Sequence, residues 1–131
     1  MLIGESERWF SEKLETLPQS DEVKAYVVGV FSRYAVSVDD ELSRESLVLV
    51  YDKALQAGDF AGFQRIGDWV LWVRTFASSS IRCEPKLIDS LGQASYGACH
   101  RIMRGQWKVY EELSLQLPIL TAMTRARLKS L

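Results

Sequence analysis

Residues 66–72 read Ile-Gly-Asp-Trp-Val-Leu-Trp, and this stretch decides the fold. It sets Asp68 in a run of large apolar residues, although aspartate is rarely buried without a partner. At about 100° per residue, the segment 60–77 is apolar over most of a helix circumference, and Asp68 lies on its one narrow polar strip. Such a helix usually lies at the centre of a bundle or at an interface between subunits. Asp68 is then either a paired contact between helices or a surface acid.

The rest of the chain also shows helical spacing, without a convincing strand pattern. Gly58 suits the residue that follows a helix, and Pro85 suits the first position of one. Pro118 should kink or break the last helix. The sequence therefore predicts an all-α fold, a single-domain irregular bundle of about six helices over residues 1–131. The predicted helices cover residues 6–17, 21–37, 39–57, 60–77 and 85–104, and a last one runs from 106 towards the C-terminus.

The composition is that of an ordinary globular protein, with 131 residues, 47% hydrophobic, 25% charged and a formal net charge of −1. No apolar run approaches the roughly 20 residues of a membrane span. The first residues lack the basic start and apolar stretch of a signal peptide. We therefore expect a cytoplasmic protein without membrane association.

Sequence patterns that carry well-known chemistry are missing from the chain. It contains no G-x-S-x-G, no phosphate-binding G-x-x-x-x-G-K-S/T, no H-E-x-x-H and no C-x-x-C. Two cysteines and one histidine are too few for a structural zinc site. The sequence predicts no catalytic residue, no metal ligand and no cofactor, and it favours a non-enzymatic role.

Three segments within residues 63–120 carry a recognisable pattern: IGDWVLWVRTF, LIDSLGQASYGACHR and WKVYEELSLQLP. They contain a Gly-Asp-apolar helix, a helix with spaced glycine and tyrosine, and a final helix that starts aromatic-Glu-Glu-Leu. The pattern resembles a set of small bacterial all-helical proteins that have no assigned activity. The resemblance implies a helical fold and carries over no functional residue. The matching positions are Gly67, Asp68, Gly92, Tyr96, Tyr110, Glu111, Glu112 and Leu113.

The same resemblance implies that the helices of Asp68 and Tyr96 meet. The carboxylate would then accept a hydrogen bond from the Tyr96 hydroxyl and pair with a nearby arginine, either Arg65 or Arg74. We expect these four residues to form a structural polar network.

Two further groups of residues are candidate binding sites. Trp72 borders the polar strip of its helix, and a small apolar or amphipathic ligand could lie between helices near Trp72, Tyr96 and Met103. Such a ligand needs a cavity of roughly 300 Å³ or more. A small basic patch could contact nucleic acid, which is the weaker alternative. Its residues are Lys86, Arg101, Arg104 and Lys108.

Charge is divided unevenly along the chain. Residues 1–60 hold 12 acidic and 6 basic side chains, a net charge of −6, and residues 61–131 hold 5 and 10, a net charge of +5. Opposite charges and the wide apolar helix favour an interaction or regulatory protein that associates with itself or with another protein. This is the leading functional hypothesis, ahead of the small-ligand binder and the nucleic-acid contact.

Overall fold

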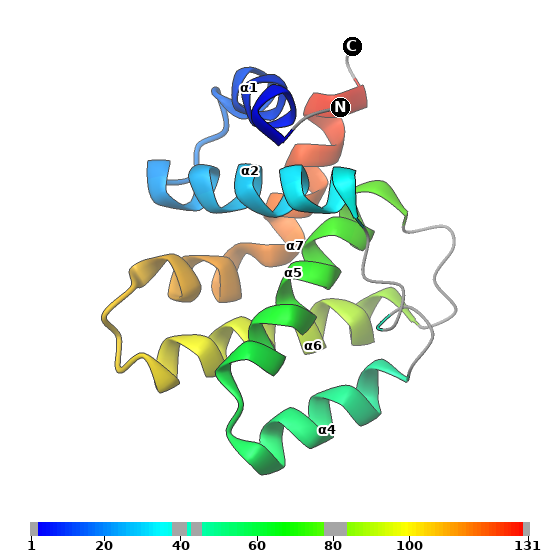
Figure 1. Ribbon diagram of the computed structural model, residues 1–131, viewed down its shortest axis with the longest axis vertical. Helices are drawn as coiled ribbons and strands as arrows, with labels where there is room; N and C mark the ends of the chain where they lie inside the picture. Colours follow the sequence, from blue (N-terminus) through cyan, green and yellow to red (C-terminus); the bar gives the residue numbers. More distant parts are fainter. Residues whose placement is uncertain (1–2, 38–41, 43–45, 78–83, 130–131) are drawn as a thin grey trace.

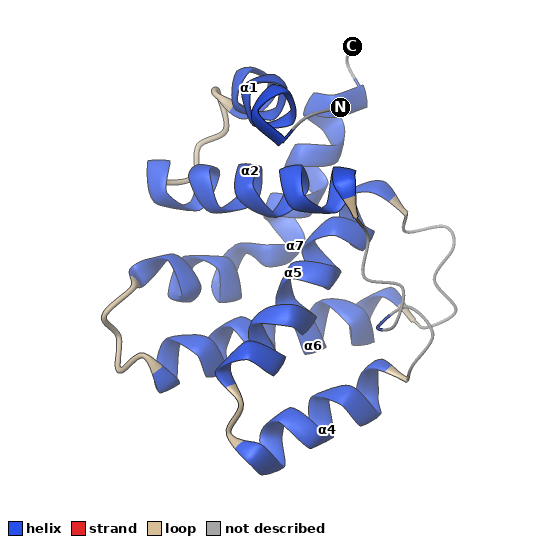
Figure 2. Cartoon of the chain, in the orientation of Figure 1, coloured by secondary structure: helices blue, strands red, loops and turns tan. Residues whose placement is uncertain are grey.

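A computed structural model of the chain describes residues 3–37, 42, 46–77 and 84–129. Helices account for nearly all of these residues, and the described part contains no strand (Figure 2). The predicted all-α fold is confirmed. Figure 1 shows the six main helices, which are α1 (Ile3–Leu14), α2 (Asp21–Val36), α4 (Leu47–Ala57), α5 (Phe60–Phe76), α6 (Pro85–Ile102) and α7 (Lys108–Lys129).

Local chemistry explains most of the helix ends. The Ser20 side chain accepts a hydrogen bond from the backbone N–H of Val23 and so caps the start of α2. Gly58 ends α4 in the left-handed conformation, with φ of 60°. Arg104 and Gly105 have φ of 54° and 73°, which a helix cannot continue through. For this reason α6 ends at Ile102, two residues before the predicted end of the segment 85–104.

Two further helices differ from their predicted bounds by three residues or more. The helix expected over 6–17 is α1, which spans Ile3–Leu14 and is followed by a turn in which the N–H of Leu17 donates to the carbonyl of Leu14. Within the helix expected over 39–57, Leu42 is helical and α4 starts at Leu47, because Ser46 before it has an extended backbone. Residues 39–41 and 43–45 lie outside the described part of the chain.

Helix α5 lies at the centre of the bundle. It packs against α2, α4, α6 and α7 (Figure 1). Its side chains Ile66, Val70 and Leu71 are completely buried. Neighbours within the chain therefore cover most of the wide apolar circumference predicted for this helix, and Phe76 at its end stays 42% exposed. Helix α1 packs mainly on α2 and touches α7, so the first and last helices lie side by side.

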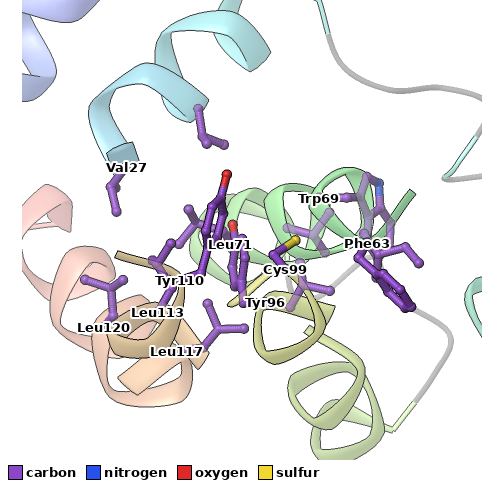
Figure 3. Packing of buried hydrophobic residues seen from close by; sticks show 14 of the residues in the cluster. Val27, Phe63, Trp69, Leu71, Tyr96, Cys99, Tyr110, Leu113, Leu117 and Leu120 are labelled. Atoms are coloured by element: carbon purple, nitrogen blue, oxygen red, sulfur yellow. The ribbon is translucent and has the colours of Figure 1, made fainter. Parts of the chain in front are cut away.

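The approach of α5, α6 and α7 depends on Gly92. A Cβ atom at this position would lie 2.6 Å from Cδ2 of Leu117 and 2.7 Å from Cγ1 of Val70, which is closer than real Cβ atoms come, so these side chains would have to move. Gly92 of α6 thus makes room for the side chains of Val70 and Leu117. Figure 3 shows how Leu117, Tyr96 and Tyr110 meet in the resulting core.

Pro118 lies within α7 without ending it, so the helix is kinked and not broken. Because proline has no N–H, the carbonyl of Ser114 loses its helical donor. Gln93 of α6 replaces that donor, since its Nε2 lies 2.9 Å from the Ser114 carbonyl oxygen, and Ser114 Oγ donates in return to the Gln93 carbonyl at 2.8 Å. Figure 1 shows α7 changing direction near its middle.

Candidate functional site

Asp68 is a buried acid with three donors. Only 4% of the residue is exposed. The hydroxyls of Tyr26 and Tyr96 donate to its Oδ1 at 2.6 and 2.8 Å, and Nη2 of Arg33 lies 3.2 Å from Oδ2. Arg33 reaches in from the surface, where 59% of its side chain is exposed. The carboxylate therefore joins α2, α5 and α6 through one satisfied cluster of polar atoms.

Gly67 makes room for this cluster. A Cβ atom at position 67 would lie 2.7–2.8 Å from three ring carbons of Tyr96, which is closer than real Cβ atoms come. The ring of Tyr96 can therefore lie directly on the backbone of α5, with its hydroxyl aimed at the next residue, Asp68. The adjacent Gly-Asp pair thus contacts both the ring and the hydroxyl of Tyr96.

The cluster extends to α7 through Tyr110. The rings of Tyr26 and Tyr110 meet edge to face with centroids 5.6 Å apart, and the ring of Tyr96 lies 6.1 Å from that of Tyr110. Gln64 Nε2 donates to the Tyr110 hydroxyl at 2.8 Å. Figure 3 shows the rings of Tyr96 and Tyr110 together in the core. Four helices thus contribute polar groups to one interior region.

Burial controls the protonation of these groups. The pKa of Asp68 is raised, because desolvation outweighs the hydrogen bonds from Tyr26 and Tyr96 and the charge of Arg33. The pKa values of Tyr26 and Tyr96 are raised by burial and then by the Asp68 charge, and burial also raises that of Tyr110. The tyrosines therefore keep their protons and act as donors. The arrangement holds helices together and offers no base that is open to a substrate.

The arginine of this network differs from the two that the sequence suggested. Tyr96 contacts Asp68 as expected, but the guanidinium group comes from Arg33, which belongs to α2. Arg74 pairs instead with Asp89 of α6, with Nε 2.8 Å from Oδ1. Arg65 is not among the residues that contact Asp68 in the structure. Tyr26 was also missed, because no spacing within α5 or α6 points to α2.

The three residues suggested for a ligand site have different surroundings. Trp72 packs against Phe76, Tyr34 and Phe31, with ring centroids 4.3, 5.6 and 5.8 Å away. Tyr96 is fully buried and bonded to Asp68, and Met103 caps the end of α6. The three residues therefore have different partners in the structure, and their role in ligand binding stays a prediction.

The four residues suggested for a basic patch do not lie together either. Lys86 lies in the first turn of α6 and Arg101 in its last turn, about 22 Å apart at 1.5 Å per residue. Arg104 and Lys108 lie near Arg101, in and after the turn that leads to α7. The structure thus leaves Lys86 outside the group formed by the other three.

A groove lies where α2 meets the turn between α6 and α7. Its volume is about 710 Å³. Trp107 is 53% exposed at this groove and stacks on Tyr110, with ring centroids 6.1 Å apart and planes 21° from parallel. Tyr26 connects the groove to Asp68, since its hydroxyl donates to that carboxylate. The lining residues are Glu22, Ala25, Tyr26 and residues 105–109.

The outer face of α7 carries a second feature, a row of apolar side chains in solvent. Leu115 is 69% exposed and Ile119 61% exposed, one turn apart. Ala122 and Ala126 continue the line along the helix and are also exposed. We call these four residues the outer row. The buried residues of α7, among them Leu113, Leu117 and Leu120, lie on the opposite side.

Among the described residues, no group of three or more His, Cys, Asp or Glu side chains could hold a metal ion. No helix in the same part of the chain is long and apolar enough to cross a membrane. The resemblance to small bacterial helical proteins stays a prediction. No model of a protein family, no curated protein and no solved structure matches this chain.

Proposed function

We propose that this protein is a non-enzymatic interaction or regulatory protein that associates with a second copy of itself. The outer row of α7 carries the proposal. Single exposed apolar residues are ordinary on protein surfaces. Leu115 and Ile119, however, lie on one face of one helix and are followed on that face by two alanines. Amphipathic helices bind partners through apolar rows of this spacing.

The energy available at such a contact is substantial. Full burial of a leucine or isoleucine side chain contributes about 1.5–3 kcal/mol. Association between two copies would bury Leu115 and Ile119 from each, so four large side chains would leave water. This gain opposes the loss of translational and rotational freedom, which makes weak to moderate dimer affinity the expectation.

Sedimentation velocity over a range from low to high micromolar protein tests the proposal. The monomer mass is 14.9 kDa. We expect the weight-average mass to rise towards twice that value as the concentration increases. A mass that stays at the monomer value over the whole range would refute self-association.

The groove beside Trp107 supports a second candidate function, the binding of a small amphipathic ligand. Its volume lies in the range of ligand sites, 300–1,000 Å³. The exposed indole offers an aromatic surface, while Glu22 and Lys108 place charges at the same groove. These residues replace Trp72 and Met103 in the ligand hypothesis.

The dye anilinonaphthalene sulfonate, which is aromatic and anionic, is a direct probe of this groove. Its fluorescence should rise on binding to the wild type and fall to background with Trp107→Ala. Trp9→Ala is the matched control, because Trp9 is an exposed tryptophan on α1 and does not line the groove. Equal dye binding by the two variants would exclude the groove as the dye site.

A further inference from the structure

We infer that two copies of this chain pair through α7 in an antiparallel, two-fold symmetric contact. In this register Leu115 of one copy faces Ala126 of the other, and Ile119 faces Ala122. The inference rests on the proposed self-association and adds the surface, the orientation and the register. The spacing, sizes and charges of the residues along α7 support it.

The outer row belongs to a longer heptad pattern. Exposed or half-exposed residues follow one another along α7 at intervals of four, three, four, three, four and three. This is the spacing with which helices of a coiled coil meet. The central positions are apolar and the terminal ones charged, which limits the length of the contact. The residues in order are Lys108, Glu112, Leu115, Ile119, Ala122, Ala126 and Lys129.

Side-chain size favours the antiparallel orientation. The large residues Leu115 and Ile119 lie in the first half of the row and the two alanines in the second half. Two antiparallel copies place each large side chain against a small one, which fills the space evenly. Parallel copies would put leucine against leucine at one end and leave a gap between alanines at the other.

Charge favours the same orientation and fixes the register. Where Leu115 faces Ala126, Glu112 faces Lys129 of the second copy. A two-fold axis repeats this ion pair at the other end of the contact, because such an interface uses the same patch twice. Parallel helices would instead bring like charges together at each end. Exposed ion pairs contribute little affinity, but like charges in contact are rejected, so this pair selects orientation.

The surroundings of α7 hold Glu112 in place without covering the outer row. The backbone N–H of Ser20 donates to Oε2 of Glu112 at 3.0 Å, and Gln19 Nε2 lies 3.4 Å from Oε1 of Gln116. The turn between α1 and α2 thus borders the row on one side. Leu115 and Ile119 still project into solvent.

The bend at Pro118 is compatible with the pairing. At 100° per residue, Pro118 and Ser114 lie on the flank of α7, between the outer row and the buried face. The bend therefore lies to the side of the outer row. The Ile119–Ala122 pairs next to the two-fold axis lie entirely after Pro118, so the centre of the contact joins two segments that follow the bend.

Disulfide trapping tests orientation and register. We would prepare Leu115→Cys and Ala126→Cys, each with Cys83→Ser, and oxidise them mildly, alone and as a 1:1 mixture. The inference predicts rapid cross-linking of the mixture alone, because residues 115 and 126 of two copies face each other. Like positions would lie about 16 Å apart, beyond the Cα distance of a disulfide. Faster cross-linking of either single variant would overturn the antiparallel arrangement.

A second measurement separates the surface from the proposed function. Ile119→Glu should make the protein monomeric in sedimentation velocity, with an unchanged helical circular dichroism spectrum. Leu49→Glu on α4 is the matched control, because Leu49 is exposed to the same fraction, 61%, and should leave the dimer intact. A wild type that never associates refutes the proposed function. A wild type that associates while Ile119→Glu associates equally well refutes the α7 surface alone.

Discussion

Asp68 of α5 and the outer row of α7 depart from the usual distribution of side chains in opposite ways. Asp68 is an acidic group in the interior, and the cost of its burial is partly offset within the chain by Tyr26, Tyr96 and Arg33. Leu115 and Ile119 are large apolar groups that stay mostly in water. The comparison teaches that a mismatch compensated by the chain's own atoms is structural. A row of large apolar side chains left in water has no such compensation, and we therefore propose it as a surface for another molecule.

Among substitutions in the interior, replacement of Asp68 should cause the largest loss in the free energy of unfolding. Asp68→Ala leaves the hydroxyls of the buried Tyr96 and the partly buried Tyr26 without their acceptor, at about 1–3 kcal/mol for a buried group. We expect the free energy of unfolding in urea to fall by about 2–5 kcal/mol. Asp68→Asn is the control, since its amide oxygen can still accept from both hydroxyls, and it should cost clearly less. Equal losses for the two variants would contradict the hydrogen-bonding account.

The two faces of α7 can be compared directly with one pair of substitutions. Leu117→Ala removes a completely buried side chain and should cost about 2–5 kcal/mol. Leu115→Ala lies two residues away on the outer row and should change the unfolding free energy of the monomer by less than about 0.5 kcal/mol. Chemical denaturation at low protein concentration gives both values. A large loss for Leu115→Ala would mean that the outer row is packed within the monomer.

A smaller change in stability tests whether Gly67 makes room for the ring of Tyr96. Gly67→Ala forces a methyl group into the ring of Tyr96, and overpacking costs about 1–3 kcal/mol. The higher helix propensity of alanine stabilises the variant by at most about 1 kcal/mol, so we expect net destabilisation. Gly29→Ala in the middle of α2 meets no atom within 4 Å and should stabilise the protein. Thermal unfolding should show a lower melting temperature for Gly67→Ala and a higher one for Gly29→Ala. Two changes of the same sign would argue against this role of Gly67.

The smallest expected effect is a pH dependence that comes from Asp68. Its pKa in the folded protein lies above the ordinary value of 3.8, so the folded state binds the proton more tightly than the unfolded chain. The contribution of Asp68 to stability is therefore present at low pH and is lost as the pH rises through the folded pKa. The stability of the wild type relative to Asp68→Asn should fall as the pH increases from 3.8 through that window. A difference that rises with pH would show that the folded pKa is lowered.

Much of the fold could be predicted from local patterns. Gly58 and Pro85 mark helix ends because their backbone preferences act within a few residues. The network around Asp68 was predictable only in part. Tyr26 and Arg33 lie 42 and 35 positions away in sequence, and only the packing of α2 on α5 brings them to the carboxylate. Spacing within one helix pointed instead to Arg65 and Arg74.

The outer row could not be recognised from sequence for a different reason. Helix α7 carries two apolar rows, one containing Leu113 and Leu117 and the other Leu115 and Ile119. Both have helical spacing, so periodicity does not say which row the rest of the chain covers. Conversely, the apolar circumference of α5 suggested a subunit interface, but neighbouring helices cover it. Tertiary contacts decide between core and surface in both cases.

The most direct test of the central claim is the thermal midpoint as a function of protein concentration, measured for the wild type and Ile119→Glu. Association stabilises the folded state by mass action, so a dimer melts at a higher temperature when it is more concentrated. We predict that the wild-type midpoint rises with concentration and that the Ile119→Glu midpoint does not. A wild-type midpoint that is independent of concentration, or a variant that follows the wild type, would contradict the assignment of the outer row as the contact between two copies.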